Sequence, residues 1–235
     1  MKDCNIPEYF LLKSIKTALR FIKEDLIEKR RQGREKESYL ALICEDKKIE
    51  RYNYFEQAED LLLRDESEGK LLNVDLMYNM NFDNTPSIYI SLSGEQYSDN
   101  NLSVEQQSLP LIVGESRFDV FTRRKNANYS IYIVSDNSNE ANLLYYILDC
   151  ICISLTAHFS FSGFYNITHG GQDVQIENDK IPKHIFVKAL NIGLQYKRSA
   201  PSFYTLPTFN ELFFQGRPTG LKNDLNDTLD NDNDL

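Results

Sequence analysis

Histidine and cysteine are scarce in this chain, which limits the chemistry that can be expected of it. The 235 residues include three histidines and four cysteines. A zinc site needs about four Cys or His ligands, commonly in spaced pairs, and the pair Cys150 and Cys152 does not have that spacing. The cysteine spacing does not resemble a disulfide framework either, and a chain of this length needs no cross-links. We therefore expect neither a metal nor another cofactor.

The loops that hold phosphates and the segments that enter membranes are also missing. Neither G-x-x-x-x-G-K-[ST] nor G-x-G-x-x-G occurs. No stretch of 18 residues is apolar throughout, because Asp149 interrupts the apolar segment 143–155, and residues 1–10 lack a signal-peptide pattern. With no recognisable catalytic constellation, we expect a non-enzymatic protein that is made in a reducing cytoplasm and does not bind a membrane.

A surplus of positive charge is absent as well, since the formal net charge is −9. An acidic balance argues against a general surface for duplex DNA, whose affinity depends on neutralising phosphates. Basic residues nevertheless cluster at 23–36, where Arg30, Arg31 and Arg34 are candidates for contact with DNA or a partner. The simpler interpretation is a solvated helix end. The last fourteen residues carry five Asp, and they match no calcium-binding loop.

The composition that remains, 41% hydrophobic and 12% aromatic, is that of a folded domain. Apolar residues at helical spacing predict a helix over 7–32. The block 36–85 is expected to be an insertion or subdomain, with a short strand at 38–46, a helix at 54–66 and a second strand at 70–80.

The rest of the chain is predicted to be a core module over 86–200. It should contain a strand at 87–94, a polar loop at 95–108, and two antiparallel strands at 117–124 and 128–134 joined by the turn-like KNAN. A helix should begin at Ser138, with two strands joined by a turn at Gly170-Gly171 and a last strand at 185–198 following it. Grouped strands predict an α+β fold, a mostly antiparallel sheet covered by two amphipathic helices.

The pair Cys150 and Cys152 falls within the predicted apolar helix. At 100° per residue the two side chains point about 200° apart, so they cannot grip one ion, and core packing is the expected role. His158, His169 and Asp173 are the groups from which an unrecognised enzyme site would be built.

The C-terminal half resembles structural proteins of tailed bacteriophages. The resemblance rests on a strand that runs into S-D-N-S-N-E and an apolar helix (129–155), followed by FSGFYN, GGQD and a last strand with an aromatic residue (161–203). It points to the tail-terminator or tail-completion family, with residues 1–35 supplying the first helix of the module. The resemblance implies a virion protein that forms a sixfold or twelvefold ring at the head–tail junction. Such a ring bridges portal, neck and tail proteins and leaves a channel for genomic DNA.

Residues 201–235 are predicted to form an extended arm with a disordered acidic tail. Aromatic residues on such an arm suggest docking on a neighbouring subunit or another partner; they are Phe203, Tyr204, Phe209, Phe213 and Phe214. Three interpretations therefore stay open: a ring or connector protein, an adaptor that binds a partner through this arm, and an enzyme with an unrecognised site.

Overall fold

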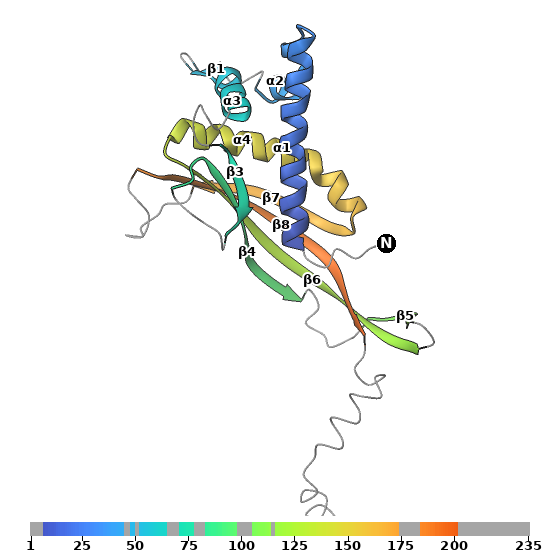
Figure 1. Cartoon of the computed structure of the whole chain (residues 1–235). Coiled ribbons are helices and arrows are strands. Elements are labelled where there is room, and N and C mark those ends of the chain that lie inside the picture. Colours follow the sequence, from blue (N-terminus) through green and yellow to red (C-terminus); the bar gives the residue numbers. More distant parts are fainter. Residues whose placement is uncertain are drawn as a thin grey trace, which may run out of the picture. The chain divides into compact units, whose positions relative to one another are not determined.

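The computed structural model describes residues 7–44, 48–49, 52–64, 71–77, 83–97, 105–113, 116–173 and 184–201. Figure 1 labels its helices and strands. The chain divides into two compact units. The first comprises residues 1–98 and 124–197, and the second comprises residues 99–123 and 198–235. The first unit contains the helices, the main sheet and the candidate site.

The described part of the first unit begins with helices and ends with long strands. Its elements are α1 (Pro7–Arg31), a 3₁₀ turn (Glu35–Glu37), α2 (Tyr39–Cys44), β1 (Lys48–Ile49), β2 (Tyr52–Asn53), α3 (Tyr54–Leu63), β3 (Asn73–Leu76), β4 (Ser87–Tyr97), the later part of β6 (Ser116–Ser135), α4 (Ser138–Phe161), β7 (Phe164–Asp173) and most of β8 (Phe186–Pro201). The helices predicted at 7–32, 54–66 and from Ser138 are confirmed, as are the strands at 87–94 and 185–198.

The main sheet is open and mostly antiparallel, with the order β3-β4-β6-β8-β7. Strand β3 runs parallel to β4, whereas β4 is antiparallel to β6 and β7 is antiparallel to β8. Because β3 belongs to the block 36–85 and pairs with β4, part of that block completes the sheet. The mixed α+β class with a mostly antiparallel sheet is therefore confirmed.

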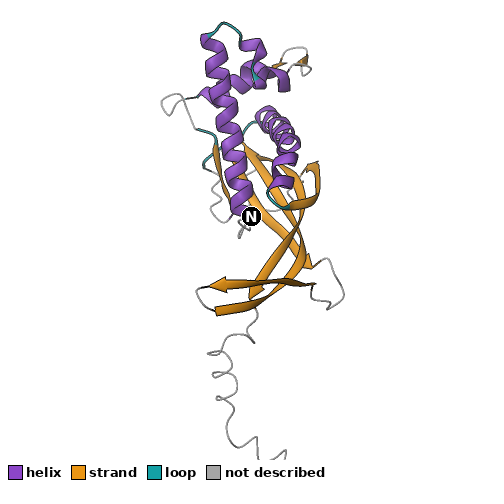
Figure 2. Ribbon diagram, turned by 90° about the vertical axis from the view of Figure 1, so that its right-hand side faces the viewer, coloured by secondary structure: helices purple, strands orange, loops and turns teal. Residues whose placement is uncertain are grey.

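One face of the sheet is covered by α1 and α4, which Figure 2 shows on the same side of the strands. Helix α1 contributes a stripe of buried residues at three- and four-residue spacing, and α4 contributes a second one. Alternate residues of β4, β6 and β8 meet them in a continuous core, whose fully or almost fully buried members include Leu11, Ile15, Ile22, Ile88, Ile90, Ile131, Ile133, Leu144, Ile147, Leu190 and Ile192. The opposite face has a smaller cluster of Tyr89, Val134 and Ile185.

The S-D-N-S-N-E segment joins β6 to α4. The helix is capped by Asn137, whose side-chain oxygen accepts from the backbone N–H groups of Asn139 and Glu140. The Ser135 hydroxyl at the end of β6 donates to the Glu140 carboxylate. This junction therefore sets the direction in which α4 leaves the sheet.

The strand predicted at 38–46 is wrong, because residues 39–44 form α2. Leu40 and Cys44 are buried at a spacing of four, and the Ser38 hydroxyl oxygen accepts from the Ala41 N–H. A short apolar run is compatible with either structure, since six residues cover fewer than two turns of a helix and show too few repeats to identify the period. Packing against α1 and α3 favours the helix.

The KNAN turn is also wrong. Residues 116–135 form the single strand β6, and the pairing with β4 extends from Ser87↔Val134 to Tyr97↔Lys125. Residues 95–97, predicted as loop, are part of β4. This part of the sheet can accommodate polar residues, because Lys125, which is 8% exposed, forms an ion pair of 2.6 Å with Glu95.

The turn predicted at Gly170-Gly171 is wrong for a different reason. Strand β7 continues through both glycines to Asp173, and Gly170 and Gly171 lie opposite Asn191 and Leu190 of β8. A Cβ atom at Gly171 would overlap the Tyr145 ring and hydroxyl, whereas one at Gly170 would meet no atom within 4 Å. Gly171 therefore serves the close approach of Tyr145 from α4 and not a reversal of the chain.

In the second unit, β5 (Glu105–Val113) pairs antiparallel with the first part of β6, from Glu105↔Thr122 to Val113↔Ser116. The loop predicted at 95–108 is thus wrong for residues 105–108. The segment 117–124 also pairs with a different strand from the one predicted, since residues 128–134 continue it along the same strand.

Candidate functional site

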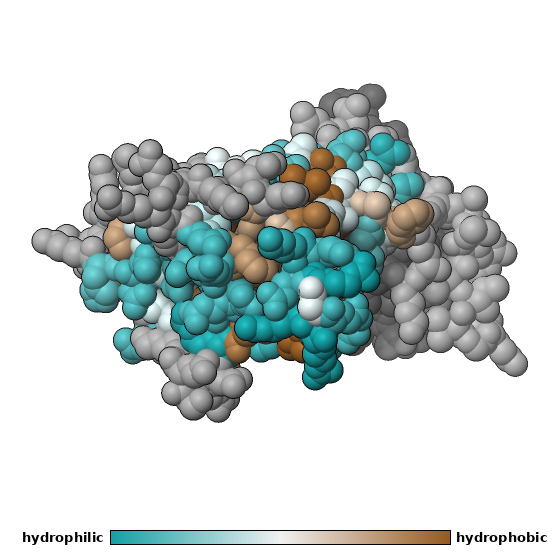
Figure 3. Space-filling view, turned by 90° about the horizontal axis from the view of Figure 1, so that it is seen from above, coloured by the Kyte–Doolittle hydropathy of each residue, from teal (hydrophilic) through white to brown (hydrophobic). Residues whose placement is uncertain are grey.

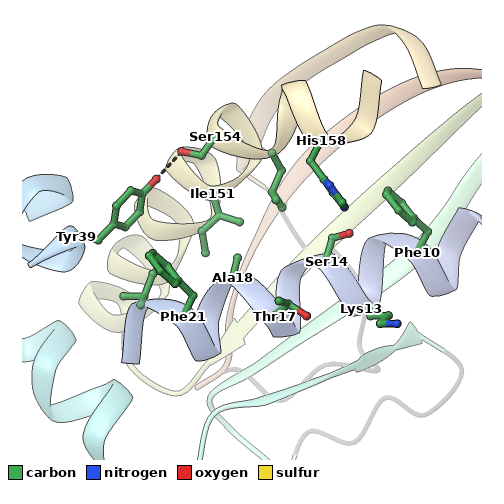
Figure 4. A pocket seen from close by; sticks show the side chains of 12 residues that line it. Phe10, Lys13, Ser14, Thr17, Ala18, Phe21, Tyr39, Ile151, Ser154 and His158 are labelled. Atoms are coloured by element: carbon green, nitrogen blue, oxygen red, sulfur yellow. Dashed lines mark hydrogen bonds between the residues drawn. The ribbon is translucent and has the colours of Figure 1, made fainter. Parts of the chain in front are cut away.

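An apolar groove lies between α1 and α4 in the described part of the first unit. Its volume is about 720 Å³, and Figure 4 shows the side chains that line it. Helix α1 supplies one wall, α4 the other, and Tyr39 of α2 stands at one end. We call this hollow the α1–α4 groove; its lining residues are Phe10, Lys13, Ser14, Thr17, Ala18, Phe21, Ile22, Tyr39, Ile151, Ser154, Leu155 and His158.

The groove exists because small side chains on α1 lie between two aromatic ones. Ser14, Thr17 and Ala18 occupy the middle of this face, and Phe10 and Phe21 lie toward its ends. The small residues leave room that larger side chains would have filled. These small residues were present in the sequence, but no groove was predicted from them. The leucine and isoleucine stripe of the same helix indicated only the side that faces the core.

Ring contacts hold the two ends of the groove. Phe10 stacks on His158 with 5.3 Å between ring centroids, and Phe21 meets the edge of Tyr39 at 6.2 Å. The hydroxyls of Tyr39 and Ser154 are hydrogen-bonded (Figure 4). Ser154 also donates to the Cys150 carbonyl. Phe21 is nevertheless 56% exposed. Apolar surface therefore remains accessible in a cavity whose shape is held by neighbouring contacts.

A row of cations lies beside the groove on α1. Lys13, Lys16, Arg20 and Lys23 recur at spacings of three and four, so they share one side of the helix, and we call them the basic stripe. Arg20 approaches Glu24 at 3.8 Å, and the three lysines form no ion pair with any described residue. Two smaller hollows along α1 are lined in part by the same cations. Seen from above, brown apolar patches lie between teal hydrophilic areas (Figure 3).

The two histidines considered for an enzyme site have different partners among the described residues. His158 stacks on Phe10 at the groove, whereas Nε2 of His169 on β7 lies 3.7 Å from Oδ1 of Asp149 on α4. Nothing is described of the side chain of Asp173. Among the described residues, no group of three or more His, Cys, Asp or Glu side chains has an arrangement that holds a metal ion.

The two cysteines occupy different environments, as their helical spacing predicts. Cys152 is buried in the core, and Cys150 is half-buried. Burial, and secondarily the Asp149 carboxylate, raises the pKa of the Cys152 thiol to about 12. At neutral pH this thiol is protonated and therefore a poor nucleophile and metal ligand. The packing role is confirmed for Cys152.

The basic end of α1 is engaged with neighbouring carboxylates. Arg30 lies 2.9 Å from Glu59 of α3 and 3.8 Å from Glu35. Arg34 forms a hydrogen-bonded ion pair with Glu37, which raises the pKa of Arg34 and lowers that of Glu37. Arg31 is exposed. A contact of these arginines with DNA or a partner stays a prediction, and the arm aromatics at 203–214 lie outside the described residues.

Helix α4 is long and apolar enough to cross a membrane by length and composition alone, with a mean hydropathy of 1.5 over its best window. The core helix of a folded domain passes the same test. In this unit eight residues of α4 are buried, and most of them belong to the core formed with α1 and the sheet. Packing thus accounts for the apolar residues on the core-facing side of α4, whereas 39% of the apolar window is buried and Ile153 and Phe161 are exposed.

Comparison with known proteins assigns no family. No family model matches the chain, and no curated protein matches it significantly.

Proposed function

We propose that this chain is a structural virion protein of a tailed bacteriophage. Copies of it form a homo-oligomeric ring, as a neck, connector or tail-terminator component at the head–tail junction. The ring bridges portal and tail proteins and leaves a channel for DNA. The family proposed here comes from the resemblance of residues 129–155 and 161–203 to structural proteins of tailed bacteriophages. The surfaces and the charge of the chain support it.

The observation that carries the proposal is that the first unit presents two different surfaces suited to contact. The sheet is open, with β7 at one edge and β3 at the other, and the α1–α4 groove lies on the helical side. A strand at a sheet edge has backbone groups that can pair with another chain. A cyclic ring with more than two subunits needs two distinct, complementary surfaces on each copy, because every interface joins one surface to the other.

The charge of the chain suits a channel for DNA. At a net charge of −9, the subunit as a whole repels a polyanion. Arg30 and Arg34, the cations first considered for DNA, have carboxylate partners within the same unit. A ring built from such subunits would let the genome slide through without holding it.

Imaging and mass measurement test the proposal together. The full chain is purified, its mass is measured by light scattering across a range of concentrations, and negatively stained samples are examined for rings. Particles of the encoding phage are analysed by mass spectrometry for the protein. We expect closed rings and a virion component. A protein that stays monomeric and is missing from particles contradicts the proposal, and a monomer that captures one different protein through residues 203–214 supports the adaptor interpretation instead.

A further inference from the structure

We propose that the α1–α4 groove is the receptor for the C-terminal segment 203–235 of a neighbouring copy of this chain. The aromatic part of the segment (203–214) fills the groove, and the acidic part (224–234) lies along the basic stripe. This inference rests on the proposed function, because it requires copies of the chain to be neighbours. The inference specifies which two surfaces of neighbouring copies meet.

The chemistry of the groove matches that of the segment. The groove offers exposed aromatic and aliphatic surface, including Phe21 at 56% exposure. Exposed apolar hollows of this size commonly take an apolar ligand group. The segment provides such groups: Phe209, Leu212 and Phe213 follow the i, i+3, i+4 spacing of the anchors by which an amphipathic peptide binds an apolar groove.

The segment and helix α1 also carry opposite charges. In the segment, aromatic residues are followed by Asp224, Asp227, Asp230, Asp232 and Asp234. On α1, the basic stripe runs along the same stretch of helix as the groove, and Lys13 belongs to both. The three lysines of the stripe have no ion-pair partner among the described residues. An occupant with an apolar part and an acidic part therefore satisfies both surfaces, and opposite charges placed in this way favour that partner.

The segment is long enough to reach an adjacent subunit, and each copy has as many segments as grooves. Residues 202–235 follow the last described strand, and an extended segment of that length spans about 110 Å, which is enough to reach an adjacent subunit. Each copy has one segment and one groove. Such a donor and acceptor pair forms a head-to-tail interface, and a set of these interfaces closes into a ring.

Photo-crosslinking in the full chain tests the inference. Phe209 is replaced by the photoreactive amino acid benzoyl-phenylalanine, and isotope-labelled and unlabelled copies are mixed, so that each crosslinked peptide reports whether it joins two copies. We expect crosslinks between copies, from position 209 to the α1 and α4 residues of the groove. The same samples are measured by light scattering.

Two sets of variants sharpen the result. Phe21→Ser should lower the crosslink yield severalfold, whereas Leu42→Ser, at a residue that is 61% exposed and outside the groove, should leave it unchanged. The triple variant Lys13→Glu, Lys16→Glu, Lys23→Glu should weaken the association roughly tenfold at low salt, since each exposed ion pair contributes modestly and is screened by salt. In that triple variant, the additional substitutions Asp224→Lys, Asp227→Lys and Asp230→Lys should restore the association. Circular dichroism confirms that each variant is folded.

The possible failures are distinguishable. Crosslinks to the groove within one copy would mean that the segment occupies the groove of its own chain, and they would overturn the inference that a neighbouring copy supplies it. Oligomers that form without any crosslink to the groove overturn the inference and leave the ring proposal standing. A chain that stays monomeric and forms no crosslink between copies overturns both.

Discussion

Raising the pH above 9 should destabilise the protein through the Cys152 thiol. In the folded state the pKa of this group is raised from its ordinary 9.0 to about 12, first by burial and then by the Asp149 carboxylate. Between these two values the thiol of the unfolded chain loses its proton while the folded one keeps it. The unfolded state then binds fewer protons, so the free energy of unfolding falls as the pH rises. Below pH 9 this contribution to stability is fully present.

The size of the effect follows from the shift. Each pH unit above the unfolded pKa costs about 1.4 kcal/mol until the folded pKa is reached. At about pH 10.5 the loss due to this group should therefore be about 2 kcal/mol. Other groups also titrate in this range, and a comparison between variants removes their contribution.

Urea unfolding followed by circular dichroism, at about pH 8 and about pH 10.5, measures the loss in three proteins. The wild type and the Cys150→Ala variant, whose altered residue is half-buried, should lose about 2 kcal/mol more between the two pH values than the Cys152→Ala variant. Equal losses in all three would refute the assignment of a strongly raised pKa to Cys152. Rapid alkylation of Cys152 in the native protein at neutral pH would refute it as well.

Three further predictions concern stability. Asn137→Ala should lower the free energy of unfolding by about 1 kcal/mol, because two N–H groups of α4 lose their acceptor, whereas Asn137→Asp should preserve it; thermal unfolding distinguishes them. Gly171→Ala should cost about 1–3 kcal/mol, since its Cβ would displace Tyr145, and Gly170→Ala should cost clearly less. Equal effects in denaturant unfolding would contradict that steric role. Leu190→Ala should cost about 2–5 kcal/mol, because this fully buried side chain lies in the core, and a smaller loss would mean that the site collapses around the change.

The sequence alone was sufficient for the elements whose pattern is long. Helix α1 and helix α4 extend over many turns, so their apolar periodicity is repeated often enough to identify them, and β8 shows its alternation over its whole length. Together with the grouping of strands, these elements determined the α+β class. The opposite orientations of Cys150 and Cys152 followed from helix geometry alone.

The sequence was insufficient where a local pattern allows two structures. The short run at 39–44 became a helix through packing on α1 and α3, and KNAN became part of a strand through pairing with β4. Gly170 and Gly171 looked like a turn because glycine permits one, yet their place is set by Tyr145 and β8. Each outcome depends on a partner that is distant in the sequence.

The candidate site belongs to this second kind. The small residues of α1 and the cations beside them were in the sequence, and so were Ile151, Leu155 and His158 of α4. A groove arises only when two helices separated by more than a hundred residues are laid on the same face of one sheet. The sequence by itself determined which side chains are apolar, small or charged, because these are local properties. Only the tertiary structure decided which of them share one cavity, because packing between distant segments creates that cavity.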